Sequence, residues 1–438
     1  MKSIKHSTSQ LFSPESVINC REDVTINGSV YRIRDMGTFA FIVLRTGRHL
    51  VQCVYSVDKC DFKLSDLQEN DSVRVTGSVI LEDRAENGFE LHLKSIRVLS
   101  SPAAAMPFAI NKKGLNISLD VNLEHRPVAL RNHKQRAVFK LQEGIVSGFR
   151  NYMLKMGFTE IHSPKIVKAG AEGGANIFKL DYFGEKAYLA QSPQFYKQTM
   201  VGVYDRVFEI APVYRAEKHS TSRHLNEYIG LDFEMAYIDS MYDVMEMETA
   251  MLKAVMDELK ANYAPEIKLL NVDLPEINEI PSLTFIEGKE LLKSMGKKIK
   301  NYYDFEPDEE LAISEYVKKE YGSEFVFITH FPSSKRPFYA MDDREDPDYA
   351  LSFDLFFRGL EITTGGQRVH DYNEQVEKMK AKGLVPEEFQ SYLMIHKHGM
   401  PPHGGLGIGL ERLLMRLLNM QNVREAALFP RDMSRLDP

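Results

Sequence analysis

The spacing of hydrophobic residues changes near residue 100, and this change divides the chain into two parts. Between about Cys20 and Leu99, apolar and polar residues alternate in five short segments that are separated by glycine-containing turns. Alternation with a period of two is typical of strands with one buried face. With one short helical connection, the pattern predicts an OB-type β-barrel as the first domain, residues 1–103.

The second part follows a hinge, residues 104–135, which is rich in small residues and proline and then becomes basic. From Lys134 to Met156, apolar residues recur at helical spacing, which predicts a long amphipathic helix. Helical and strand-like patterns both follow, so we expect an α+β domain over residues 136–438. Its charged, helix-rich region, residues 265–350, is interpreted as an insertion or satellite.

Aromatic and basic residues lie close together in the second predicted strand of the barrel. Phe39 and Phe41 are two positions apart and therefore share a face, and Arg32, Arg34 and Arg45 are near them in the sequence. OB-type barrels bind single-stranded nucleic acid by stacking bases on such rings beside cations. The alternative is that both rings fill the interior of the barrel.

Two apolar runs of the second domain contain charged residues where a buried strand should have none. One run ends at Arg215 and Glu217, and the next run, residues 229–237, contains Asp232 and Glu234. Charged side chains are rarely buried unless they are paired or bind a ligand. The strand pair therefore predicts either a polar site on a sheet or a ladder of structural salt bridges.

Two further segments combine glycines with charged residues. Residues 353–372 place Asp354 and Glu361 in a strand-like run, and residues 403–420 form a glycine-rich strand that leads into a helix with Arg412 in its first turn. Glycines before a helix N-terminus suit phosphate binding, and they equally permit tight packing of strands. Carboxylates are ligands that Mg²⁺ prefers.

Together these segments predict a site for a nucleoside triphosphate and a second, small substrate. Arg215 and Arg412 can hold two phosphates, while Lys197, Arg368 and Asp232 remain for a small charged molecule. The sequence has no dinucleotide-binding fingerprint, Walker A loop, zinc signature or Ser–His–Asp order. We therefore expect attack on a phosphorus or acyl centre, assisted by positioning and charge stabilisation.

Composition indicates which class of protein this is and where in the cell we expect it. The 438 residues are 43% hydrophobic and 27% charged, which is ordinary for a soluble globular protein. The N-terminus lacks a signal-peptide core, and we expect a cytoplasmic protein without membrane contact. The formal net charge of −7 allows a local basic face but argues against wholesale coating of nucleic acid. Cys20, Cys53 and Cys60 are scattered and predict neither a disulfide framework nor a zinc site.

The motifs and their order resemble those of class II aminoacyl-tRNA synthetases. The segment VFEIAPVYRAEKHSTSRHLNEYIGLDFEM resembles motif 2, GGLGIGLERLLMRLL resembles motif 3, and the helix before EIHSPKI resembles motif 1. Within the class, QSPQFYKQ, EITTGGQRVHDY and REAALFPRD are similar to aspartyl-tRNA synthetases of the archaeal and eukaryotic type. The resemblance implies an anticodon-binding OB barrel and a catalytic domain with an antiparallel sheet flanked by helices.

The resemblance also implies an activity and assigns roles to single residues. The activity would be ATP-dependent activation of L-aspartate and transfer of the aspartyl group to tRNA(Asp), with Arg215, Arg412 and Glu361 as catalytic residues. Asp354, Glu361 and Thr364 would hold Mg²⁺. The implied ATP-binding residues are Arg215, Ala216, Glu217, Arg223, His224, Leu225, Tyr228, Glu361, Gly409, Leu410, Glu411 and Arg412. The implied aspartate-binding residues are Glu172, Gln194, Phe195, Tyr196, Lys197, Arg215, Asp232, Thr364 and Arg368.

Outside the catalytic residues, the resemblance implies two kinds of macromolecular contact. In the barrel, Phe41 would stack on an anticodon base, with Gln52 and Arg34 as further contacts, whereas Phe39 would stay in the core. Pro164 would meet its twofold mate in a homodimer. Three alternatives stay open: a nondiscriminating enzyme that also charges tRNA(Asn), an asparaginyl-tRNA synthetase, and a noncatalytic RNA-binding relative.

Overall fold

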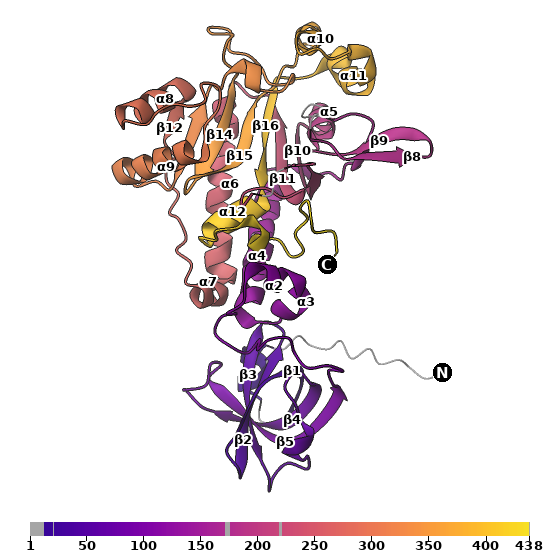
Figure 1. Cartoon of the computed structure of the whole chain (residues 1–438), viewed down its shortest axis with the longest axis vertical. Helices are drawn as coiled ribbons and strands as arrows, with labels where there is room; N and C mark the ends of the chain where they lie inside the picture. Colours follow the sequence, from indigo (N-terminus) through magenta and orange to yellow (C-terminus); the bar gives the residue numbers. More distant parts are fainter. Residues whose placement is uncertain (1–12, 21, 171–175, 219–220, 438) are drawn as a thin grey trace. The chain divides into compact units, whose positions relative to one another are not determined.

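The computed structural model describes residues 13–20, 22–170, 176–218 and 221–437 (Figure 1). The chain forms two compact units. One consists of the chain up to Ile117 together with Pro127–His133, and the other consists of Ser118–Arg126 together with the chain from Lys134 onward. The alternating segments of the sequence lie in the first unit, and the charged strand pair lies in the second.

The first unit contains a closed five-stranded barrel, as the alternating pattern predicted. Its elements are α1 (Pro14–Ile18), β1 (Val24–Asp35), β2 (Phe39–Thr46), β3 (His49–Ser56), the 3₁₀ turn η1 (Leu64–Asp66), β4 (Ser72–Leu81) and β5 (Phe89–Ser100). The strands pair in the order β1-β2-β3-β5-β4, and the barrel closes between β4 and β1. The turn η1 supplies the expected helical connection.

Strand β2 corrects one expectation about the barrel core. Ala40, Ile42 and Leu44 are buried in the interior. Phe39 and Phe41 therefore lie on the opposite face of the strand, where both are half-buried and their ring centroids are 5.5 Å apart. The core position expected for Phe39 is wrong, because a period of two keeps both rings on one face.

The second unit is built on an eight-stranded sheet of order β12-β13-β14-β15-β16-β11-β10-β6. All neighbours are antiparallel except the end pairs β12–β13 and β10–β6. A small separate sheet has the order β7-β9-β8. The strands are β6 (Thr159–Glu160), β7 (Ile166–Val167), β8 (Lys179–Tyr182), β9 (Glu185–Leu189), β10 (Arg206–Tyr214), β11 (Glu227–Ala236), β12 (Ser282–Thr284), β13 (Phe325–Thr329), β14 (Ser352–Phe357), β15 (Leu360–Gln367) and β16 (His403–Gly409).

Helices flank this sheet, as predicted for an α+β domain. They are α2 (Leu119–Glu124), α4 (His133–Lys155), α5 (Gln194–Tyr204), α6 (Met241–Asn262), α7 (Ala264–Leu270), α8 (Phe285–Ser294), α9 (Pro307–Tyr321), α10 (Tyr372–Ala381), α11 (Gln390–Gly399) and α12 (Leu410–Leu417), with the short turns η2 (Ser333–Lys335), η3 (Pro386–Phe389) and η4 (Val423–Ala426). The short helix α3 (Arg126–Ala129) belongs mainly to the first unit. Helices α4 and α6 pack closely, since a Cβ on Gly148 would lie 2.9 Å from the Cα of Val255.

The two faces of the sheet differ in character, and β11 shows the difference within one strand. Leu231, Phe233 and Met235 belong to the large apolar core that includes α4 and α6. The intervening residues Asp232 and Glu234 therefore project to the opposite face. The strand is buried on both sides, but only one of its sides is apolar.

The region 265–350 forms part of the main sheet and of the packed core of this domain. It contributes β12 and β13 to the main sheet, and its helices α8 and α9 pack around an aromatic cluster that includes Phe285, Phe305 and Phe331. The segment thus builds one edge of the sheet, next to the strand that carries Asp354.

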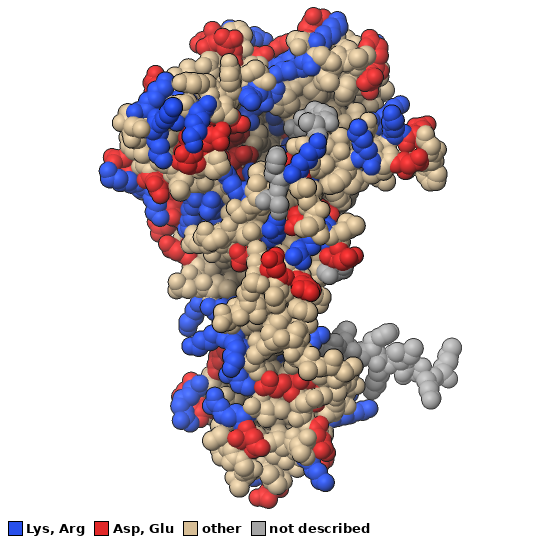
Figure 2. Space-filling model, in the orientation of Figure 1, with Lys and Arg blue, Asp and Glu red and all other residues tan. Residues whose placement is uncertain are grey.

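The surface is mixed in charge. Lysine and arginine side chains alternate with aspartate and glutamate over the visible face of each unit (Figure 2), in keeping with the modest net charge of −7. Within the described ranges, no helix is long and apolar enough to cross a membrane.

Candidate active site

A cavity of about 380 Å³ opens on the polar face of the main sheet. Residues from β10, β11, β15 and β16 contribute to its floor, and α5, the loop after β10 and residues 335–340 contribute to its walls. Parts of the sequence that are far apart thus meet here. The predicted residues that line the cavity are Gln194, Lys197, Arg215, Glu217, Arg223, His224, Leu225, Tyr228, Asp232, Glu361, Thr364, Arg368, Gly409, Glu411 and Arg412.

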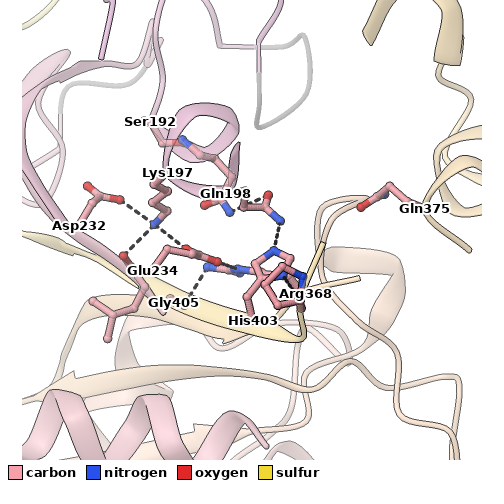
Figure 3. A network of polar contacts seen from close by, with 12 residues as sticks. Ser192, Lys197, Gln198, Asp232, Glu234, Arg368, Gln375, His403 and Gly405 are labelled. Atoms are coloured by element: carbon pink, nitrogen blue, oxygen red, sulfur yellow. Dashed lines mark hydrogen bonds and ion pairs between the residues drawn. The ribbon is translucent and has the colours of Figure 1, made fainter. Parts of the chain in front are cut away.

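One end of the cavity holds a compact network of buried charges (Figure 3). The side chain of Lys197, on α5, is 2% exposed, and its Nζ donates a hydrogen bond to Asp232 Oδ1 at 2.9 Å. Arg368 Nε donates to Glu234 Oε1 at 2.8 Å, and Glu234 Oε2 lies 3.5 Å from Lys197 Nζ. One fully buried carboxylate therefore pairs with both cations.

The glycines of β16 leave room for these carboxylates. A Cβ on Gly405 would lie 2.2 Å from Glu234 Oε2, and a Cβ on Gly407 would lie 2.8 Å from Asp232 Oδ1. On β11 itself, a Cβ on Gly230 would lie 2.6 Å from Oδ2 of Asp232, two residues along the same strand. Any side chain at these positions would displace a carboxylate. Of the two roles considered for the glycines of residues 403–420, close packing is observed at Gly405 and Gly407.

Burial and pairing act in opposite directions on the two carboxyl groups. Burial raises the pKa of Asp232, and Lys197 offsets this only in part. Burial also acts to raise the pKa of Glu234, but Arg368 and Lys197 outweigh it, and the pKa is lowered. Glu234 is therefore a fixed anion between two cations. The charges of this strand pair form a salt-bridge ladder and also line a cavity, so both predictions for it describe part of the structure.

A second layer of hydrogen bonds supports the first (Figure 3). His403 Nδ1 lies 2.9 Å from the carbonyl of Pro401, which can only accept, so we assign the proton to Nδ1. His403 Nε2 then accepts from Gln198 Nε2 at 2.9 Å, and Gln198 Oε1 accepts from Gln194 and Tyr392. Burial lowers the pKa of His403 to about 4. This neutral network fixes helix α5 and the buried lysine that it carries.

The other end of the cavity gathers arginines around a carboxylate. Arg412 Nη1 donates to the backbone carbonyl of Glu361 at 3.0 Å and lies 3.6 Å from its carboxylate, while Thr364 Oγ1 donates to Glu361 Oε1 at 3.1 Å. Burial acts to raise the pKa of Glu361, but Arg412 and its neighbours outweigh it, and the pKa is lowered. Nearby, the Arg215 guanidinium carbon lies 5.8 Å from the centre of the Tyr228 ring.

Asp354 lies on the neighbouring strand, where its Cα is paired with that of Thr364. Its carboxylate is not among the groups that line the cavity, because Arg336 covers it: Arg336 Nη2 lies 2.9 Å from Asp354 Oδ1. Burial raises the pKa of Asp354 to about 6, and the arginine opposes this shift. Within the described ranges, including this site, no group of three or more histidine, cysteine or acidic residues is arranged to hold a metal.

The loop after β10 is held from both sides. Asn176 Nδ2 donates to Glu217 Oε2 at 3.2 Å, and Arg223 forms an ion pair with Glu310 of α9. Glu310 also accepts from the backbone N–H of Glu361 at 3.1 Å, and burial raises its pKa to about 7. One buried acid thus ties this loop to β15.

Several predicted residues have positions that favour packing over ligand contact. Glu411 accepts from the backbone N–H of Ile229 at 3.0 Å and holds α12 to β11, and burial raises its pKa to about 7. Phe195 packs its ring 4.9 Å from that of Tyr392. Glu172 lies outside the described residues. Among the described residues predicted to bind ATP or aspartate, those that do not line the cavity are Ala216, Phe195, Tyr196 and Leu410.

Several residues at the Arg412 end of the cavity were not predicted, among them two that form ion pairs there. Arg336 and Glu310 both come from the region 265–350, which carries no pattern that points to chemistry. Glu310 lies in the first turn of a helix after Pro307, where an acid is ordinary. Nothing in the local sequence distinguishes either residue from a solvated surface charge.

The barrel has a cavity of its own, which brings together the three residues predicted to contact an anticodon. Arg34, Phe41 and Gln52 line it with Glu90 among others. Gln52 Nε2 donates to Glu90 Oε1 at 2.6 Å, which fixes the orientation of the amide. These residues share the outer face of the barrel, whose interior is apolar.

The remaining predictions concern isolated residues. Pro164 is exposed between β6 and β7. Cys20, Cys53 and Cys60 are free cysteines in this structure; Cys20 is exposed, and the other two are buried.

Comparison with known proteins places this geometry in a family. Residues 118–433 match the family of class II tRNA synthetases (D, K and N), and residues 24–99 match the OB-fold nucleic acid binding domain. The chain is 44% identical to the aspartate–tRNA(Asp/Asn) ligase of Deinococcus radiodurans, over 95% of this chain and 96% of that protein. It is 39% identical to the aspartate–tRNA(Asp) ligase of Pyrococcus abyssi, again over 95% of this chain and 96% of that protein.

Comparison with solved structures indicates the same family. The asparaginyl-tRNA synthetase of Pyrococcus horikoshii, complexed with asparaginyl-adenylate, matches with a TM-score of 0.88 at 30% identity, over 95% of this chain and 96% of that chain. The aspartyl-tRNA synthetase of Entamoeba histolytica matches with a TM-score of 0.86 at 30% identity, over 98% of this chain and 93% of that chain. The chain therefore belongs to the class II tRNA synthetases of the D, K and N group and is an aminoacyl-tRNA ligase.

Proposed function

We propose that this chain is an aspartate–tRNA ligase, which activates L-aspartate with ATP and transfers the aspartyl group to tRNA(Asp). The observation that carries the proposal is the pair of buried cations at one end of the cavity. Lys197 and Arg368 are held in place by Asp232 and Glu234, and both line the cavity. Two fixed cations suit recognition of a carboxylate side chain. The names of the relatives agree with this substrate.

Selection between aspartate and asparagine follows from charge, because the two side chains have nearly the same shape. A neutral amide would bring no negative charge to the cavity-facing side of Lys197 and Arg368, which would keep only the attraction of Asp232 and Glu234. Such a mismatch costs several kcal/mol when buried groups cannot find another partner. Asparagine is therefore rejected. Asp232 serves as a support for Lys197, and Gln194 and Arg215 contact the backbone groups of the amino acid.

The nucleotide occupies the opposite end of the cavity. Tyr228 stacks on the adenine, Arg215 holds the α-phosphate and Arg412 holds the γ-phosphate, an assignment supported by the convergence of these side chains on one cavity. The loop after β10 closes around the base and phosphates. Further ATP contacts come from Glu217, Arg223, His224, Leu225, Glu361 and Gly409.

Class II synthetases use ATP, typically with Mg²⁺, and the acidic residues near Arg412 fit that ion. Asp354 and Glu361 supply two hard oxygen ligands on adjacent strands, and the hydroxyl of Thr364 lies between them. Mg²⁺ is commonly held by one or two carboxylates, with phosphate oxygens and water as the other ligands. When bound, the ion would neutralise charge on the departing pyrophosphate.

The chemistry needs little proton transfer from the protein. In the first step, an oxygen of the aspartate α-carboxylate attacks the α-phosphorus, the bond to the bridging oxygen breaks, and pyrophosphate leaves. Arg215 stabilises the charge that is redistributed on the α-phosphate. In the second step, a terminal hydroxyl of the tRNA attacks the acyl carbon and AMP leaves. The attacking carboxylate is already ionised, so positioning and charge stabilisation are the main contributions of the site.

The barrel binds the anticodon, with Phe41 as a stacking platform and with Gln52 and Arg34 as polar contacts. A second candidate function differs at this point alone. The relatives from Deinococcus radiodurans and Thermus thermophilus, at 44% and 45% identity, are named aspartate–tRNA(Asp/Asn) ligases. In that case the chain would also charge tRNA(Asn) with aspartate.

Charging of tRNA transcripts tests both candidates. The purified protein is incubated with ATP, Mg²⁺ and labelled aspartate, and with transcripts of tRNA(Asp) or tRNA(Asn). Label on tRNA(Asp) alone supports the first candidate, and label on both supports the second. Absence of label from both transcripts would contradict the proposed function.

We also propose that the chain forms a homodimer through the segment around the exposed Pro164. Sedimentation of the purified protein should give twice the 50.2 kDa mass of one chain. A monomer at micromolar concentration would contradict this assembly.

A further inference from the structure

A short loop after β13 brings two cations to the wall of the cavity. It contains the turn η2, and its last residues, Lys335 and Arg336, both line the cavity. The loop is fixed from outside, because Lys382 Nζ donates to the carbonyl of Ser333 at 2.8 Å and to that of Ser334 at 3.2 Å. Lys335 is exposed, whereas the side chain of Arg336 is only 11% exposed. The two neighbouring cations thus differ in how firmly they are placed.

Arg336 is held in position by packing. Its guanidinium carbon lies 3.9 Å from the centre of the Phe331 ring. Its Nη2 lies 2.9 Å from Asp354 Oδ1 and forms an ion pair with it. Within the described ranges, Nε of this arginine has no hydrogen-bond acceptor, although the atom is buried. Buried donors without an acceptor are costly and rare, and at a cavity wall they indicate an acceptor that a ligand would bring.

Arg336 also compensates a cluster of like charge. Asp354 and Glu361 lie on the paired strands β14 and β15, where two carboxylates bring negative charge to the same place. Arg336 adds a positive charge to this place, 2.9 Å from Asp354 Oδ1. Arg336 contacts Asp354 directly.

We propose that Arg336 is a built-in counter-ion of the metal site. In the nucleotide-free protein it forms an ion pair with Asp354, and this ion pair breaks when a divalent cation binds together with ATP. The inference rests on the proposed function, in which Asp354 and Glu361 hold Mg²⁺. A cation alone has to displace the arginine and leaves its N–H groups without an acceptor. A cation that arrives with a triphosphate supplies phosphate oxygens for those N–H groups. Metal and nucleotide binding are therefore coupled through this side chain.

The test measures binding of Mn²⁺ alone, as a paramagnetic substitute for Mg²⁺, to the full-length protein without nucleotide. Electron paramagnetic resonance reports the free Mn²⁺ during a titration at about pH 8, well above the ordinary pKa of a carboxyl group. Arg336→Gln should bind Mn²⁺ at least about tenfold more tightly than the parent protein, because the competing unit charge next to Asp354 is gone. Arg336→Met, which keeps an apolar contact with Phe331, should show the same gain and serves if the glutamine variant does not fold.

Lys335→Gln is the matched control. It removes the same charge one residue away on the same cavity wall, but the Lys335 side chain is exposed and screened by solvent, so the Mn²⁺ affinity should stay within about threefold of the parent value. Equal Mn²⁺ affinity of the parent protein and the folded Arg336 variants would overturn the proposal. An equal gain in the Lys335 variant would overturn it as well. Because the titration needs neither aspartate nor tRNA, its result is independent of whether the chain charges tRNA(Asp).

Discussion

Replacing Lys197 by methionine tests how the cavity recognises its amino acid. Methionine keeps the length of the side chain and removes its charge. The parent ammonium is 2% exposed, lies 2.9 Å from Asp232 Oδ1 and 3.5 Å from Glu234 Oε2, and donates to the carbonyl of Leu406 at 2.8 Å. The variant loses all three interactions and one of the two cations at this end of the cavity.

The structure sets the size of the expected effects. Removing one partner of a buried ion pair costs about 3–5 kcal/mol when the other partner stays charged. Burial already raises the pKa of Asp232, so this carboxyl will take up a proton in the variant and reduce the cost. We expect a loss of roughly 2–3 kcal/mol in the free energy of unfolding. Activation of aspartate should fall by about two to three orders of magnitude in kcat/KM, the usual scale for losing one preorganised charged contact.

ATP–pyrophosphate exchange with aspartate and with asparagine measures this change, and urea unfolding gives the stability. Because charge is the basis of selection, the preference of Lys197→Met for aspartate over asparagine should shrink along with the rate. Lys165→Met is the control: Lys165 pairs with the buried Glu209 at 2.9 Å but does not line the cavity. It should lose stability and keep its preference. A Lys197→Met enzyme that keeps the parent preference would refute this account of recognition.

Three further changes test other parts of the molecule. Arg215→Ala should lower aspartate activation by roughly two to three orders of magnitude in pyrophosphate exchange, and near-parental exchange would rule out a role at the α-phosphate. Phe41→Ala should raise the KM for tRNA in aminoacylation without changing pyrophosphate exchange, and unaltered charging would count against anticodon stacking. Burial raises the pKa of Glu248 from 4.5 to about 8, so the folded protein binds this proton more tightly than the unfolded chain, and stability falls as pH rises from about 4.5 through about 8. Glu248→Gln keeps an acceptor for Thr363, and its stability relative to the parent should rise by roughly 2 kcal/mol between about pH 6 and about pH 8 in urea unfolding; a constant difference would exclude a buried, protonated Glu248.

The sequence was most informative where an ordinary pattern was broken. Asp232 and Glu234 interrupt an apolar strand, and the structure has them on its polar face because a period of two separates them from Leu231 and Phe233. The glycines of β16 were equally evident in the sequence, but the structural feature that requires them was not. Gly405 and Gly407 are opposite the two carboxylates, a relation that depends on the pairing of strands far apart in the sequence.

Residues next to a motif residue were harder to assign. On α5, Gln194 and Lys197 face the cavity, while Phe195 between them packs into an aromatic cluster, because successive helical residues point in different directions. Leu410 is likewise a core residue beside the cavity-lining Gly409. A motif in the sequence therefore locates the site but does not separate its lining from its support.

Contacts made by the region 265–350 could not be predicted at all. Arg336 and Glu310 reach the Arg412 end of the cavity because β13 pairs with β14 and α9 packs near β15. Neither position has a local pattern that differs from that of an ordinary surface charge. Their importance arises from tertiary packing, which brings them to Asp354 and Glu361.

The central claim is that buried cations select an amino acid with a charged side chain. The most direct test is ATP–pyrophosphate exchange by the parent protein, without tRNA, at equal concentrations of aspartate and asparagine. We predict exchange with aspartate and a kcat/KM for asparagine that is lower by at least about two orders of magnitude. Equal exchange with both amino acids, or faster exchange with asparagine, would contradict the account.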